Sequence, residues 1–187
     1  MCSVKRKTEG FYTANEITPS MNNTDLKITT QEEFLSLFGK AYWLETQFEN
    51  IMQWQAYMTI KNENYRNALF QISHDSEKHK IILTQLITHL KEVTVKNLED
   101  YAGLKEKEID FKGKWDEEII TELLKNEHLA LDLYTKLHTF TDKEFLKKIW
   151  TGSNSDQFFK HLEFLIKEEK KHITLLTPLA GKLERIL

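Results

Sequence analysis

Glu169 and His172 are the residues whose types and spacing point most directly to chemistry. They form the only Glu-x-x-His of the sequence, within FLIKEEKKHITLL. Residues three apart on an α-helix share one face, so this carboxylate and this imidazole can converge on one point. Apolar residues recur around them at helical spacing, as expected for a face turned toward a core: Leu162, Ile166, Ile173 and Leu176. A carboxylate and an imidazole on such a face predict a metal-binding pair.

Polar residues also interrupt other apolar stripes near their centres. Glu127 lies among Leu123, Leu124, Ala130 and Leu131, and His79 follows Ile72 and precedes Leu83 and Leu86. Burying an ionised group without a partner costs roughly several kcal/mol, so a shared cation is the most direct way to hold such groups in a core. We therefore expect Glu127, Glu169 and His172 to bind a metal. His79 is either a further ligand or a core histidine that is hydrogen-bonded to Asp75 or to the backbone.

The helices that carry these residues are predicted from periodicity. Only 6 glycines and 2 prolines interrupt the 187 residues, and strict apolar/polar alternation is absent, so the sequence predicts an all-α protein. We expect long helices over residues 30–61, 65–92, 116–141 and 155–176. The period is lost over residues 93–115, which is long enough to cross back along a bundle. Residues 1–29 are predicted to be a polar arm, and residues 30–187 one helical domain.

The second half of the chain resembles the ferritin-like carboxylate-bridged di-iron proteins, particularly their rubrerythrin branch. ELLKNEHLALDLYTKL is similar to the third helix of that family, with Glu127 as ligand, and FLIKEEKKHITLL is similar to the fourth. In this family two helices supply one Glu each and two supply Glu-x-x-His. The resemblance implies a ferritin-like four-helix bundle with a long crossover between helices 2 and 3. It also implies a di-iron centre, with manganese or zinc as alternatives.

The first half departs from the family pattern at one position. Aligning YRNALFQISHDSEKHKIILTQL with FFKHLEFLIKEEKKHITLLTPL sets His79 against His172 and Ser76 against Glu169. Asp75 is then the expected replacement for the missing carboxylate. Folding the first two helices about residues 62–63 places Glu49 level with Ser76, so Glu49 is the expected ligand there. Glu45, one turn away, is the alternative ligand.

Composition restricts the partners. A net charge of −3 gives no basic field for nucleic acid, and no apolar run approaches the roughly 20 residues that span a membrane. Cys2 is the only cysteine, so the chain can form neither an internal disulfide nor a thiolate metal cage. We expect a cytoplasmic protein that forms a homodimer or larger homo-oligomer, as the resemblance implies, and that takes electrons from another protein.

Two functions are compatible with these residues. The first is a metalloprotein acting in oxidoreduction, peroxide removal or iron handling. The second is a ferritin-like module whose site has degenerated and which serves in protein interaction or assembly. Ser76 favours the second function, whereas the joint placement of Glu127, Glu169 and His172 favours the first.

Overall fold

The computed structural model describes residues 27–50, 52–103 and 113–180, which are mostly helical and contain no strand. The helices in this part of the chain are α1 (Gln31–Asn50), α2 (Met52–Thr59), α3 (Glu63–Thr88), α4 (Val95–Ala102), α5 (Asp116–Phe140), α6 (Lys143–Ile149) and α7 (Asp156–Leu176). The predicted all-α class is confirmed. The helix predicted over residues 30–61 is present as α1 and α2, on either side of Ile51, which lies outside the described residues.

The starts of α3 and α5 are tied together at one end of the molecule. Asn62 caps α3, because its Oδ1 accepts a hydrogen bond of 2.9 Å from the backbone N–H of Asn64. The carboxylate of Asp116, at the start of α5, accepts hydrogen bonds from the backbone N–H groups of Lys61 and Asn62 at 3.2 and 3.0 Å. Both helices therefore begin at the same end of the molecule.

At the opposite end of the molecule, backbone hydrogen bonds connect the residues that flank the long helices. The N–H of Ile28, just before α1, donates to the carbonyl of Phe140 at the end of α5, at 2.7 Å. The N–H of Lys91, just after α3, donates to the carbonyl of Ile149 before α7, at 2.8 Å. Ile28 is buried, although it falls within the predicted arm of residues 1–29; residues 1–26 of that arm lie outside the described residues.

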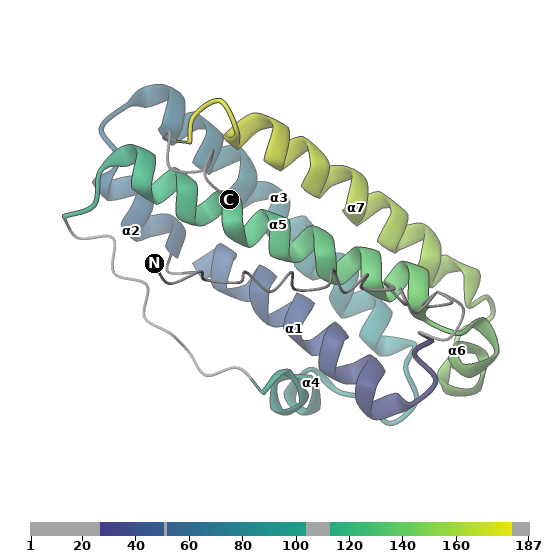
Figure 1. Cartoon of the computed structure of the whole chain (residues 1–187). Coiled ribbons are helices and arrows are strands. Elements are labelled where there is room, and N and C mark those ends of the chain that lie inside the picture. The colour runs from purple at the N-terminus through teal and green to yellow at the C-terminus, as the bar shows by residue number, and fades with distance from the viewer. Residues whose placement is uncertain (1–26, 51, 104–112, 181–187) are drawn as a thin grey trace, which may run out of the picture.

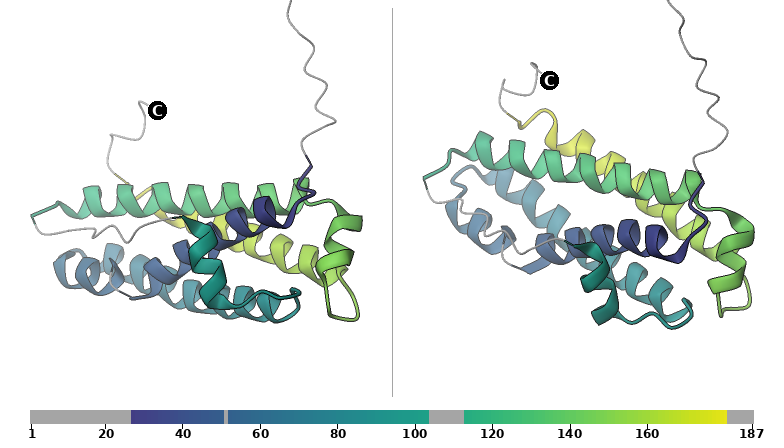
Figure 2. Two further views of the ribbon diagram at one scale, coloured as in Figure 1. Left: turned by 90° about the horizontal axis from the view of Figure 1, so that it is seen from below. Right: turned by 60° about the horizontal axis from the view of Figure 1, so that its bottom comes forward.

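These links fix the directions of the four long helices. Helix α1 packs against α3 and α5, and α7 packs against the same two helices (Figures 1 and 2). Helices α3 and α5 run in one direction, and α1 and α7 run in the other. The connection from α3 to α5 must therefore return along the length of the molecule, as a long crossover does.

Part of that connection is helical, contrary to the expectation that residues 93–115 have no period. Helix α4 begins at the cap residue Thr94 and ends at Gly103, which has a left-handed φ of 61°. It buries Leu98 and Ala102 against α1. A Cβ added to Gly39 of α1 would lie 2.6 Å from the carbonyl oxygen of Leu98, so the close packing of α4 requires glycine there. Eight residues were too few for this stripe to stand out in the sequence.

Apolar layers enclose the middle of the four long helices. Toward the start of α1, the rings of Phe34, Phe38 and Phe158 pack with centroids 5.5–6.1 Å apart. On α3 and α7, apolar side chains lie fully buried on both sides of the central polar residues: Ile72, Leu83, Leu165 and Leu176. The polar groups described below are therefore held at one depth in a hydrophobic interior. Within the described residues, no helix has the length and apolar character needed to cross a membrane.

Candidate metal centre

Five buried side chains from the four long helices meet at the centre of the molecule. Helix α1 supplies Glu45, α3 supplies His79, α5 supplies Glu127, and α7 supplies Glu169 and His172. Each is only 1–2% exposed. They form two groups, in each of which a carboxylate oxygen or ring nitrogen from every member lies within 4.8 Å of the others.

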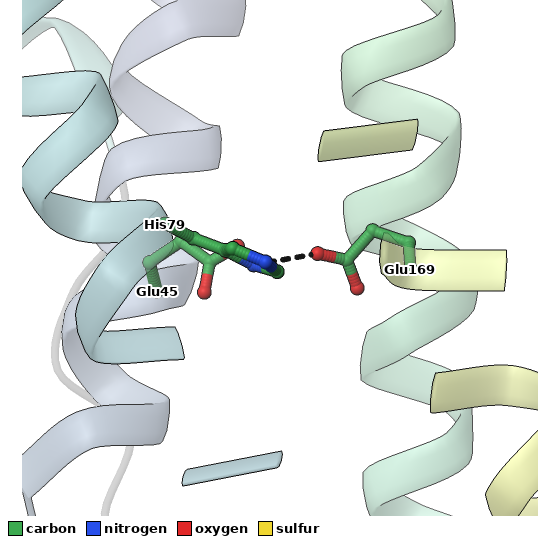
Figure 3. Close-up of side chains that lie close together, drawn as sticks. All are labelled: Glu45, His79 and Glu169. Atoms are coloured by element: carbon green, nitrogen blue, oxygen red, sulfur yellow. Dashed lines mark ion pairs between the residues drawn. The ribbon is translucent and has the colours of Figure 1, made fainter. Parts of the chain in front are cut away.

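The first group contains Glu45, His79 and Glu169 (Figure 3). His79 Nδ1 lies 3.0 Å from Glu169 Oε1 and 3.4 Å from Glu45 Oε1. Glu45 and His79 come from neighbouring helices, and Glu169 faces them from the opposite side of the interior. The imidazole nitrogen is thus placed between two carboxylates.

The second group contains Glu127, Glu169 and His172. His172 Nδ1 lies 3.1 Å from Glu127 Oε2 and 3.6 Å from Glu169 Oε2. In both groups, therefore, the Nδ1 atom of a histidine faces a glutamate on the adjacent helix: Glu45 for His79, and Glu127 for His172.

Glu169 belongs to both groups and connects them. Its Oε1 faces His79 and its Oε2 faces His172, so its two oxygens point to two different positions. The two imidazole rings stack with their centroids 5.5 Å apart and an interplanar angle of 25°. The two groups are therefore adjacent and share one carboxylate.

Three of the nitrogen and oxygen atoms that could bind a metal in these groups have no hydrogen-bond partner within the described structure. They are His79 Nδ1, Glu127 Oε1 and Glu169 Oε1. His79 Nδ1 and Glu169 Oε1 are 3.0 Å apart, yet the direction of the ring nitrogen does not fit a hydrogen bond between them. Leaving a buried polar atom unpaired costs about 1–3 kcal/mol, and more for a charged group. A cation in the first group would contact His79 Nδ1 and Glu169 Oε1, and a cation in the second group would contact the carboxylate of Glu127.

The donor separations fit a metal coordination sphere. Metal–nitrogen and metal–oxygen bonds of about 2.0–2.2 Å place neighbouring ligand atoms roughly 2.8–3.6 Å apart at angles between right and tetrahedral. The nitrogen–oxygen separations in the two groups are 3.0 and 3.4 Å at His79, and 3.1 and 3.6 Å at His172. The residues present therefore fit one divalent ion in each group.

Asp75 contacts the outer nitrogen of His172. Its Oδ2 lies 3.4 Å from His172 Nε2, and its Oδ1 accepts a hydrogen bond of 2.7 Å from Lys78. Carboxylates face both ring nitrogens, so the metal-free ring carries a proton on each. If a metal ion took the place of the proton on Nδ1, Nε2–H would still donate to Asp75. A carboxylate in this position orients a metal-binding histidine.

Tyr134 supports Glu45 in a similar way. Its hydroxyl group is fully buried and donates a hydrogen bond of 2.5 Å to Glu45 Oε1. Burial and the charge of Glu45 raise the pKa of Tyr134 well above its usual range, so the phenol stays protonated and remains a donor.

The two histidines are cationic when no metal is bound. Burial by itself lowers the pKa of His79, but the adjacent carboxylates of Glu169 and Glu45 raise that pKa to about 10. Burial likewise lowers the pKa of His172, and Glu127 and Glu169 raise it to about 11. A metal ion would replace the proton on each Nδ1.

The carboxylates respond to the same surroundings in different directions. Burial raises the pKa of Glu169, but its contacts with His172 and His79 outweigh burial and lower the pKa to about 2. Burial and the charge of Glu169 raise the pKa of Glu127 well above its usual range. Burial also raises the pKa of Glu45. Glu169 is therefore the one carboxylate of these three whose pKa is lowered by its contacts with the histidines.

The structure brings four of the six predicted ligands into the two groups: His79, Glu127, Glu169 and His172. Asp75 lies beside this set, against the outer nitrogen of His172. The side chain of Glu49 lies outside the described residues, and its rival Glu45 is a member of the first group. Folding the chain about residues 62–63 sets Glu45 level with His79 as well as Glu49 level with Ser76, so this signal in the sequence did not separate the two glutamates.

Comparisons with protein-family models, with curated proteins and with solved structures found no match for this chain.

Proposed function

We propose that this protein binds a pair of divalent metal ions at the centre of a ferritin-like four-helix bundle. One ion would be held by Glu45, His79 and Glu169, and the other by Glu127, Glu169 and His172. The observation that carries the proposal is the position of Glu169, whose two oxygens face two histidines from within a buried, largely apolar interior. The directions of the long helices, with a crossover between α3 and α5, support the bundle.

Three carboxylates and two imidazoles suit iron or manganese, and they are also compatible with zinc. An iron pair would supply one-electron oxidation and reduction, which suits oxidoreductase, peroxide-scavenging or iron-handling activity. The protein would orient the ions through Asp75 and Tyr134 and would exclude bulk water by the surrounding apolar layers. Electrons would come from another protein, because one cysteine cannot form a second, thiolate-bound iron site.

Metal analysis of the purified protein, with and without the substitution His172→Ala, tests this proposal. We expect about two equivalents of iron, manganese or zinc per wild-type chain after reconstitution, and a loss of at least one equivalent in the variant. His128→Ala is the matched control, since His128 is exposed and directly follows Glu127. It should bind as much metal as the wild type.

Substoichiometric metal that is unaffected by His172→Ala would overturn the metal-centre proposal. That result would favour the second function, a helical module for interaction or assembly that retains only the geometry of a former site. The absorption band of an oxo-bridged ferric pair in the iron-loaded protein would separate redox chemistry from simple metal storage.

A further inference from the structure

The two halves of the centre are related by an approximate internal repeat. His79 corresponds to His172, and on each side of them Ile72 and Leu83 correspond to Leu165 and Leu176. All four apolar residues are fully buried, and both histidines are 1% exposed. The glutamates on α1 and α5 also correspond to each other in this repeat, because Glu45 faces His79 as Glu127 faces His172.

Ser76 is the one position at which this repeat fails. It corresponds to Glu169, which supplies the carboxylate shared by the two groups. Ser76 is buried to the same degree as Glu169 and lies one helical turn before His79, on the same face of α3. A serine side chain ends two bonds short of the position that a glutamate carboxylate would reach. Among the side chains that the structure describes, the two groups contain no carboxylate from α3 to match Glu169 of α7.

The charge balance and the number of ligands both indicate that a pair of divalent ions here would need one further ligand. With neutral imidazoles, the three carboxylates balance all but one of the positive charges of two divalent ions. Within the described part of the chain, each group also offers three ligand residues, fewer than the four or more ligands that these metals take. One singly charged ligand with two oxygens would correct both deficits.

We propose that the carboxylate of a small exogenous molecule occupies the place that Ser76 leaves open, opposite Glu169 and between the two metal ions. This proposal rests on the dinuclear centre proposed above. A carboxylate matches the charge and shape of the protein group absent from the repeat, whereas phosphate would carry excess negative charge. Burial of all five ligand residues restricts the molecule to one of about the size of formate or acetate.

The full-length protein reconstituted with cobalt(II) provides the test. Formate and acetate are titrated separately while the visible absorption of cobalt is recorded, with phosphate and chloride at equal ionic strength as comparison anions. We expect a saturable spectral change with one carboxylate bound per cobalt pair, and little change with chloride or phosphate. The number of cobalt ions per chain is measured in the same samples.

Two substitutions at one position supply the controls. Ser76→Glu restores the carboxylate, so it should bind two cobalt ions and lose the response to acetate. Ser76→Ala removes only the hydroxyl group, so it should keep the response. The circular dichroism of both variants is compared with that of the wild type.

The outcomes separate this inference from the metal-centre proposal. Two bound cobalt ions with no spectral response to formate or acetate in the wild type would overturn the inference and leave the metal centre intact, whatever the variants do. An equal acetate response in a folded, cobalt-loaded Ser76→Glu protein would also overturn it. Failure of the wild type to bind two cobalt ions would contradict the metal centre itself.

Discussion

Glu169 is the residue on which a dinuclear site depends most, because its oxygens face the two histidines separately. Glu45 and Glu127 each contact one histidine only. The loss of Glu169 should therefore affect both ions, and the loss of either of the other two glutamates should affect one.

Isosteric substitutions can measure this difference. Glu169→Gln is expected to abolish stoichiometric binding of both metals, because an amide cannot supply the anionic bridge. Glu127→Gln should retain about one equivalent. Metal content after equilibration with a weak chelator gives the result. Glu163→Gln on the exposed side of α7 is the control and should bind like the wild type. Equal loss in Glu169→Gln and Glu127→Gln would contradict separate subsites.

The raised histidine pKa values predict that metal binding releases protons. At pH 7 both rings are protonated in the metal-free protein, since their pKa values are about 10 and 11. Each metal must displace a proton from Nδ1, so binding should release about two protons from the histidines and should tighten as pH rises. Isothermal titration calorimetry in two buffers of different ionisation enthalpy measures this number. Identical heats in both buffers would contradict the prediction.

Among the helices, α4 is a short element that packs closely against the backbone of α1. Gly39 allows the carbonyl of Leu98 to approach α1 closely, and Leu98 and Ala102 are the buried residues of α4 on that side. The docking of α4 also places one part of the crossover against α1, the helix that supplies Glu45.

The substitution Gly39→Ala tests the docking of α4. Its effect on the free energy of unfolding should have one sign if α4 packs against Gly39 and the opposite sign if it does not. In an unobstructed helix, alanine would stabilise the protein by up to about 1 kcal/mol. Here the new Cβ would lie 2.6 Å from a backbone oxygen, so we expect the substitution to destabilise the protein by about 1–3 kcal/mol. Urea denaturation of the metal-free protein measures the free energy of unfolding. A stabilised variant would show that α4 does not pack at this site.

At the scale of the whole molecule, the proposed metal ligands come from all four long helices, so bound metal would link these helices. A ligand that binds only the native state stabilises it by about 2.7 kcal/mol when its free concentration is a hundred times its dissociation constant. We expect removal of each metal ion by a chelator to lower the melting temperature by roughly 5–10 °C for a chain of this size. Scanning calorimetry before and after chelation measures the shift.

His172→Ala supplies the control for that experiment. Because this variant should already lack at least one metal ion, the chelator should lower its melting temperature by less than that of the wild type. An equal shift in both proteins would mean that the chelator acts elsewhere than at this centre.

The sequence by itself determined the features that depend on neighbours along one helix. The helical class follows from few glycines and prolines and from the apolar periods. The common face of Glu169 and His172 follows from their spacing of three, and the burial of Glu127 follows from the leucines around it. These are local properties, because a helix fixes the relative directions of side chains within a few turns.

Only the tertiary structure decided which residues from different helices lie at one depth. It placed Glu45 against His79, turned Asp75 to the outer nitrogen of His172, and gave Glu169 a position between both histidines. The offset between two helices is set by the contacts at their ends, such as Asp116 with Asn62 and Ile28 with Phe140. One helical turn of offset, about 5.4 Å, is enough to exchange Glu45 for Glu49, and spacing within a single helix carries no information about it.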